Sequence, residues 1–120
     1  MNNEKNLVFI EHILENINKI ESFSNNLSRK EFNNNELVQY AIIRATEIIG
    51  EAVANLSNSF KEKYPEILWK EIVGTRDKMI HHYFGVNLDL VWDIIKKDLP
   101  NLKEKMLKIR TELENKEKEK

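Results

Sequence analysis

Apolar residues recur every three or four positions along most of this chain, and very little interrupts them. The 120 residues include only three glycines and two prolines. Intervals of three and four place side chains on one face of an α-helix, whereas a half-buried strand needs strict alternation. No segment of useful length alternates in that way, and no internal repeat is visible. The sequence therefore predicts an all-α fold, a bundle of four to five helices.

Local signals divide the chain into the expected helices. Ser28 to Glu31 has the pattern of a capping box that opens a short turn, and residues 57 to 65 form a polar loop. Gly50 would let another backbone approach the second helix closely, and Gly85 marks the end of the third. We expect helices over about residues 4–24, 36–57 and 69–83, a fourth that begins after Asn87 or Asp89, and a last one that begins at Pro100.

Composition limits the class of protein. Residues 1–111 are long enough for one helical domain, and residues 112–120, almost wholly Glu and Lys, are expected to fray. The absence of cysteine removes disulfides and thiolate metal sites and agrees with a cytoplasmic location. No signal-peptide pattern is visible, and the apolar runs are far too short to cross a membrane. A net charge of −1 argues against a general nucleic-acid coat protein, so any contact with RNA must be local and weak, or be assembled from two copies of a site.

The segment from Arg76 to Tyr83 carries the residues best suited to chemistry. Cleaving RNA without a metal requires a base for the 2′-hydroxyl and a cation for the phosphate, which an imidazole and a guanidinium can supply. On a continuous helix, Arg76 and His81 would lie about 140° apart, so a two-fold dimer would help to bring them together. Asp77 and His81 would share a face, where Asp77 could orient the imidazole. From spacing alone, an Asp–His pair and a solvated arginine on a surface helix are the simpler interpretation.

A resemblance changes that balance. Arg76, His81 and Tyr83, spaced Arg-x4-His-x-Tyr, resemble the signature of the HEPN superfamily, specifically its HepT-like toxin ribonucleases. The similarity covers about residues 5–110 and includes four further blocks, which are residues 44–52, 65–74, 84–92 and 98–100. The motif alone is weakly specific, but these blocks in this order are strongly so.

The resemblance implies a symmetric homodimer that cleaves RNA without metal at a cleft between the subunits. His81 would be the base for the 2′-hydroxyl and Arg76 would stabilise the scissile phosphate. Asp77 stands where the superfamily often has asparagine, and its carboxylate would weaken RNA binding slightly. The products would carry a 2′,3′-cyclic phosphate or its hydrolysed form and a free 5′-hydroxyl. The implied partner is a minimal nucleotidyltransferase antitoxin that transfers AMP to Tyr83 and so inactivates the enzyme.

Other interpretations stay open. The same helical dimer could be a non-catalytic accessory or substrate-recognition subunit of the nucleotidyltransferase, or a scaffold with a vestigial cleft. The residues suggest no cofactor and no metal site, because His81 and His82 are adjacent and His12 is the only other histidine. Arg44, Glu47 and Glu51 lie on one side of the second helix. An ion-pair stripe on the surface is the favoured interpretation, and a stripe that positions Arg76 is the alternative.

Overall fold

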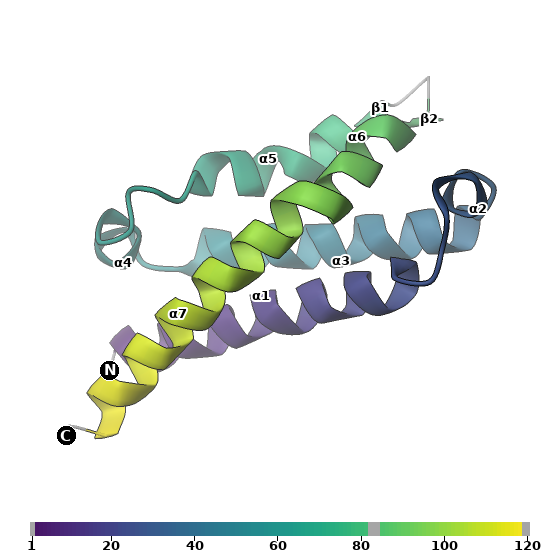
Figure 1. Cartoon of the computed structure of the whole chain (residues 1–120). Coiled ribbons are helices and arrows are strands. Elements are labelled where there is room, and N and C mark those ends of the chain that lie inside the picture. The colour runs from purple at the N-terminus through teal and green to yellow at the C-terminus, as the bar shows by residue number, and fades with distance from the viewer. Residues whose placement is uncertain (1, 82–84, 119–120) are drawn as a thin grey trace.

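The first two long helices form the base of the bundle, as their apolar spacing predicts. In this computed structural model, which describes residues 2–81 and 85–118, α1 (Asn2–Ser24) and α3 (Glu36–Asn55) lie antiparallel and in contact (Figure 1). The core side of α1 is sealed from solvent, with Ile10, Ile13 and Ile17 all at 0% exposure. Asn35 caps α3 by accepting a hydrogen bond from the Val38 N–H at 3.1 Å. The all-α prediction is confirmed.

Two further helical segments complete the bundle. Helix α5 (Trp69–Met79) packs on the other side of α3 from α1, and a run formed by α6 (Leu88–Asp93), η1 (Ile94–Asp98) and α7 (Leu99–Lys118) crosses α1 diagonally (Figure 1). The whole is elongated, with extents of 50 × 28 × 21 Å. None of the described helices is both long and apolar enough to cross a membrane.

The joint between α6 and α7 is a π-helical segment rather than a break. The Leu99 N–H donates to the Ile94 carbonyl, five residues back. Pro100 explains this, because proline has no N–H to donate and its ring crowds the carbonyl four residues earlier. The last helix therefore begins close to Pro100, as expected, and the capping role of Asn87 is also confirmed, since its side chain accepts from the Leu90 N–H at 3.2 Å.

Two short helices occupy the connections. The capping box of α2 (Arg29–Asn33) is formed, with the Ser28 N–H donating to Glu31 at 3.0 Å and the Glu31 N–H donating to the Ser28 hydroxyl at 3.1 Å. These bonds, the one from the Ser28 N–H foremost, lower the pKa of Glu31. The prediction of a loop over residues 57–65 is wrong in part, because Ser57 caps a helix, α4 (Asn58–Glu62), that buries Phe60.

The third helix ends earlier than predicted. It stops at Met79, and Ile80 is extended, with φ −118° and ψ 126°. A small antiparallel pair follows, in which β1 (Ile80–His81) faces β2 (Gly85–Val86) and the Asn87 N–H donates to the Met79 carbonyl at 2.7 Å. The predicted continuation of the helix is wrong at Ile80 and His81, because β-branched and imidazole side chains have weak helix propensity and these hydrogen bonds favour the extended form. The rest of the predicted extension, to Tyr83, lies outside the described residues.

The charged C-terminal segment is helical over most of its length. Helix α7 continues to Lys118, within the range that we expect to fray. Leu113 is 1% exposed, and the Tyr64 hydroxyl donates to Glu112 at 2.6 Å. An Arg110–Glu114 pair at 3.6 Å adds support along the helix. One apolar anchor and these contacts hold a segment whose composition alone suggests a loose end.

Candidate active site

Arg76 lies in the last turn of α5, just before the hairpin, and its guanidinium is held between two carboxylates. Its Nε is 3.8 Å from Oε1 of Glu47 on α3, and its Nη1 is 3.3 Å from Oδ1 of Asp77. The Arg76 side chain is 39% exposed, so its end is accessible to a ligand. The guanidinium is therefore partly at the surface, with its Nε edge turned toward α3.

His81 does not share a helix with Arg76. Its backbone belongs to β1, paired with Gly85, so the angle of about 140° calculated for a continuous helix does not apply. The expectation that Asp77 and His81 share a helical face is wrong for the same reason. Asp77 instead contacts Arg76, and its side chain is 84% exposed. Gly85, at φ +80°, has the left-handed conformation that glycine favours and lets β2 begin beside His81.

Part of the motif falls outside the described residues. Tyr83, predicted as the modified residue, is outside them, as are its neighbour His82 and the side chain of His81. Among the side chains that the structure describes, no three of His, Asp or Glu form a group that could hold a metal ion.

The Arg44–Glu47–Glu51 stripe of α3 forms ion pairs within itself and also contacts Arg76. Arg44 Nη1 is 3.7 Å from Glu47 and 4.0 Å from Glu51, which confirms the ion-pair stripe. Glu47 also reaches Arg76, which sequence reasoning held only as the alternative. The sequence feature that indicates the contact between Glu47 and Arg76 is Gly50, one turn beyond Glu47 on α3. A Cβ there would meet the Val73 carbonyl at 3.4 Å, so the helices are close enough for Glu47 to span them.

The same side of α3 carries exposed apolar residues. Leu37 is 81% exposed and Tyr40 is 63% exposed, and both lie on the helical face of Arg44 and Glu47. Val73 on α5, one turn before Arg76, is 44% exposed. This surface, which we define by Leu37, Tyr40 and Val73 together with the Arg44–Glu47–Arg76 pairs, is the stripe face.

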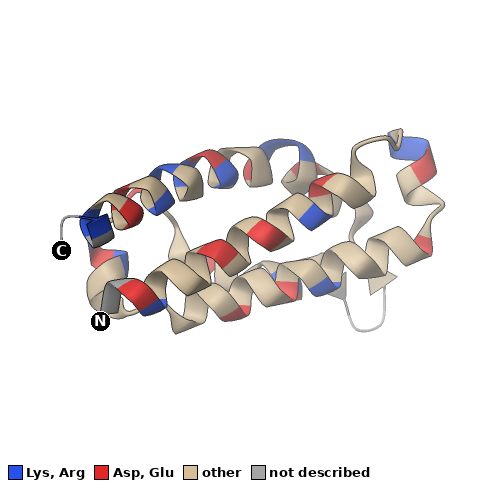
Figure 2. Ribbon diagram, turned by 90° about the horizontal axis from the view of Figure 1, so that it is seen from below, with Lys and Arg blue, Asp and Glu red and all other residues tan. Residues whose placement is uncertain are grey.

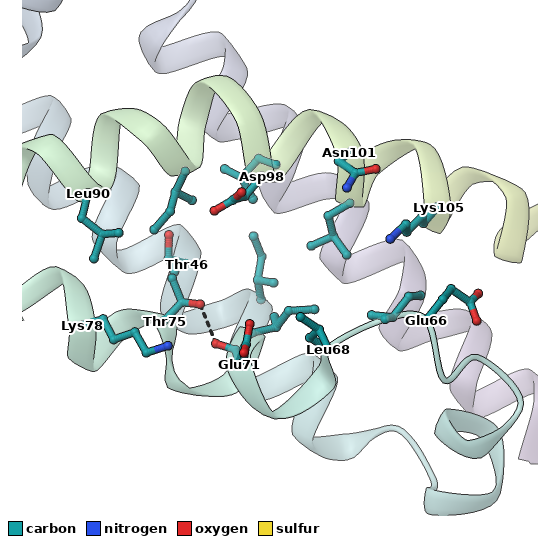
Figure 3. A pocket seen from close by; sticks show the side chains of 16 residues that line it. Thr46, Glu66, Leu68, Glu71, Thr75, Lys78, Leu90, Asp98, Asn101 and Lys105 are labelled. Atoms are coloured by element: carbon teal, nitrogen blue, oxygen red, sulfur yellow. Dashed lines mark hydrogen bonds between the residues drawn. The ribbon is translucent and has the colours of Figure 1, made fainter.

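A separate groove of about 300 Å³ runs between α5 and the η1–α7 run (Figure 3). Apolar side chains such as Ile49 and Ile94 line it. Lys78 and Lys105 stand near its ends, and Glu71 and Asp98 lie between them. Lys78 lies two residues, about 200°, from Arg76 on α5. The groove therefore opens on the other side of α5 from the stripe face and is not part of the Arg76 site.

Charge over the surface is mixed. Figure 2 shows Lys and Arg interspersed with Asp and Glu along the long helices, α7 most of all. Arg76 and the neighbouring Arg44 together pair with three carboxylates, Glu47, Asp77 and Glu51. Among the described residues, Glu51 pairs with Arg44 and not with Arg76. Such a surface attracts a polyanion only locally. General charge therefore gives a polyanion little attraction to this part of the surface.

Comparison with known proteins gives a consistent result. The family model described as Ribonuclease HepT-like matches residues 13–109. A Thermococcus cleftensis protein named "Probable ribonuclease HepT" is 45% identical over 102 residues, which are 85% of this chain and 93% of that protein. "Putative RNase MJ1380" of Methanocaldococcus jannaschii is 45% identical over 98 residues, 82% of this chain and 90% of that protein.

A longer relative contains a second named activity. "Gamma-glutamylcyclotransferase and putative RNase MJ0434", also from Methanocaldococcus jannaschii, is 47% identical over 107 residues, which are 89% of this chain but 48% of that protein. The chain thus spans about half the length of this relative. No solved structure matches the chain significantly.

Proposed function

Because the chain belongs to the HepT-like ribonuclease family, we propose that it is a metal-independent endoribonuclease, the toxin of a pair whose antitoxin is a minimal nucleotidyltransferase. The observation that carries this proposal is the position of Arg76. It stands at the end of α5 with an accessible guanidinium, and the hairpin that bears His81 begins four residues later. A phosphate-binding cation and a base are thus close in the chain at a helix end.

The proposed chemistry is an internal transesterification. His81 takes the proton of the 2′-hydroxyl, and the 2′-oxygen attacks the adjacent phosphorus. Arg76 stabilises the extra charge of the pentacoordinate transition state, and the bond to the 5′-oxygen then breaks. The leaving oxygen receives a proton, for which His81 of a second subunit is the proposed donor. One product ends in a 2′,3′-cyclic phosphate and the other in a 5′-hydroxyl.

The proposed active form is a symmetric homodimer acting in the cytoplasm. The stripe face supports this, since it exposes Leu37 and Tyr40 next to the arginines. Large exposed apolar side chains clustered beside charged ones are typical of surfaces that bind a partner. In a two-fold dimer the same face meets itself, which would set two copies of Arg76 near one cleft.

Regulation is proposed to act through Tyr83. Transfer of AMP by the nucleotidyltransferase to the phenol would place a phosphate and a nucleoside two residues from His81. The added negative charge and bulk would compete with the RNA phosphate for Arg76. The Asp77 carboxylate, which contacts Nη1 of Arg76, would moderate the positive charge there and so weaken RNA binding slightly.

The test is RNA cleavage by purified protein in excess EDTA, with analysis of the product ends and with the intact mass checked for AMP on Tyr83. We expect the wild type to leave cyclic phosphate and 5′-hydroxyl ends, and the Arg76→Ala and His81→Ala variants to lose activity. Equal cleavage by all three would identify a contaminant. An unmodified wild type without activity would refute the nuclease and favour an accessory subunit of the nucleotidyltransferase.

A further inference from the structure

The inner edge of the Arg76 guanidinium is in an unusual environment. Its Nε is buried and, among the described residues, has no hydrogen-bond partner. Buried donors in folded proteins are nearly always paired, so an unpaired one asks for an explanation. The nearest acceptor charge is Oε1 of Glu47, at 3.8 Å, which is ion-pair distance but longer than a hydrogen bond. A small change in the Glu47 side chain would complete the bond.

Glu47 is itself held from both sides. Its Oε1 faces Arg76 at 3.8 Å and its Oε2 faces Arg44 Nη1 at 3.7 Å, so each carboxylate oxygen serves a different arginine. The close contact of Gly50 with the Val73 backbone fixes the spacing between α3 and α5 within one turn of this pair. The carboxylate is therefore placed by its helix and by Arg44, not by Arg76 alone.

We infer that Glu47 is the positioning residue of Arg76. This inference rests on the proposed function. A carboxylate on the Nε edge fixes the plane of the guanidinium and leaves the Nη edge facing outward. That edge presents two parallel N–H groups, the arrangement that matches two phosphate oxygens. Of the described carboxylates, only Asp77 contacts the Nη edge, and it is exposed and easily displaced.

A simpler role for Glu47 would be to neutralise the charge of Arg76 without positioning it. If Glu47 only neutralised Arg76, removing its charge would strengthen RNA binding and raise kcat/KM. If it positions Arg76, removing its charge lets the guanidinium rotate, so kcat falls without a rise in KM. Misplacing a catalytic group by about 1 Å can cost about 100-fold in rate. The two roles therefore predict changes of opposite sign in kcat/KM.

Glu51 offers a matched control for the experiment. It lies one turn beyond Glu47 on α3 and contacts Arg44 at 4.0 Å, and no contact with Arg76 is found among the described residues. We would measure kcat and KM for RNA cleavage by wild type, Glu47→Gln and Glu51→Gln. We expect Glu47→Gln to lower kcat by about 10- to 100-fold, while Glu51→Gln stays within about twofold of wild type. Far-ultraviolet circular dichroism and thermal melting would verify that all three are folded.

A second readout does not depend on activity. The chain has four arginines, so its NMR spectrum contains four Nε–Hε resonances, and Arg76→Lys identifies that of Arg76. Glu47→Gln should shift this resonance and speed its exchange with water, and Glu51→Gln should not. An active wild type with full kcat in Glu47→Gln and an unshifted resonance would overturn the inference alone. An inactive wild type with the shift would overturn the proposed function and leave the Glu47–Arg76 contact established.

Discussion

The contact between α3 and α5 at Gly50 can be tested by replacing this glycine first with alanine and then with valine. A methyl group at this position would lie 3.4 Å from the Val73 carbonyl oxygen and 3.6 Å from the Val73 Cα, which is ordinary contact. Alanine also gains about 0.8–1.0 kcal/mol of helix propensity over glycine. We therefore expect Gly50→Ala to stabilise the fold by about 0.5–1 kcal/mol, which raises the melting temperature by about 2–4 °C.

Valine should reverse the sign. Its two γ-carbons extend beyond the methyl position into the backbone of α5, and such overpacking costs about 1–3 kcal/mol. Gly74 is the matched control, because it also lies within a helix but a Cβ there meets no described atom within 4 Å. Gly74→Val should therefore cost far less than Gly50→Val.

The assay is urea unfolding followed by circular dichroism, at one fixed protein concentration so that any self-association is constant. The difference between the two valine variants isolates the contact between helices from the propensity of valine. If Gly50→Val were as stable as Gly74→Val, α3 and α5 would not touch at Gly50. That contact would then not fix the distance between Glu47 and Arg76. If Gly50→Ala were destabilising by more than about 1 kcal/mol, the helices would lie closer than described.

Three further changes test other parts of the account. Asp77→Asn removes a carboxylate 3.3 Å from Arg76. With the interaction energy calculated at the dielectric constant of water, this loss of negative charge should lower the KM for RNA by about two- to fivefold at low salt, measured by steady-state cleavage. Tyr64 has its pKa raised, first by burial and then by the Glu112 carboxylate to which it donates. Its contribution to stability is therefore complete below the ordinary tyrosine pKa of about 10 and is lost as the pH rises beyond it, so urea unfolding should show the wild type losing more stability above that pH than Tyr64→Phe. Leu113→Ala should cost about 2–4 kcal/mol of unfolding free energy because the side chain is 1% exposed, and a loss below about 0.5 kcal/mol would mean that the end of α7 is not anchored.

The parts of the fold that could be predicted are those that local chemistry decides. The stripe of α1 and the capping box at Ser28 each depend on residues within one or two turns, and both are present as expected. Gly50 predicted a close backbone, and that backbone is Val73 of α5. In each case the residues on which the prediction depends lie within the segment itself.

The errors occur where side-chain packing or strand pairing, rather than composition, decides the outcome. Helix α4 forms because Phe60 packs against Tyr64 and Trp69, with ring centroids 5.2 Å and 6.3 Å apart, which a polar composition does not reveal. The third helix ends at Met79 because the chain returns and pairs Ile80 with Val86. Because the helix ends at Met79, helical spacing no longer places Asp77 and His81 on one face. Arg76 is therefore the motif residue whose contacts are best defined. Glu47 was ambiguous from sequence because an i,i+3 pair with Arg44 already accounted for it.

The most direct test of the central claim changes the substrate and leaves the protein intact. Wild-type protein in excess EDTA would be given an RNA oligonucleotide with a known cleavage position and a copy with a single 2′-deoxynucleotide immediately 5′ of that position. If His81 activates the 2′-hydroxyl and Arg76 stabilises the resulting phosphorane, the all-ribose RNA is cut to a cyclic phosphate and the substituted bond stays intact. Cleavage of the substituted bond would show that the nucleophile is not the 2′-hydroxyl and would contradict the account.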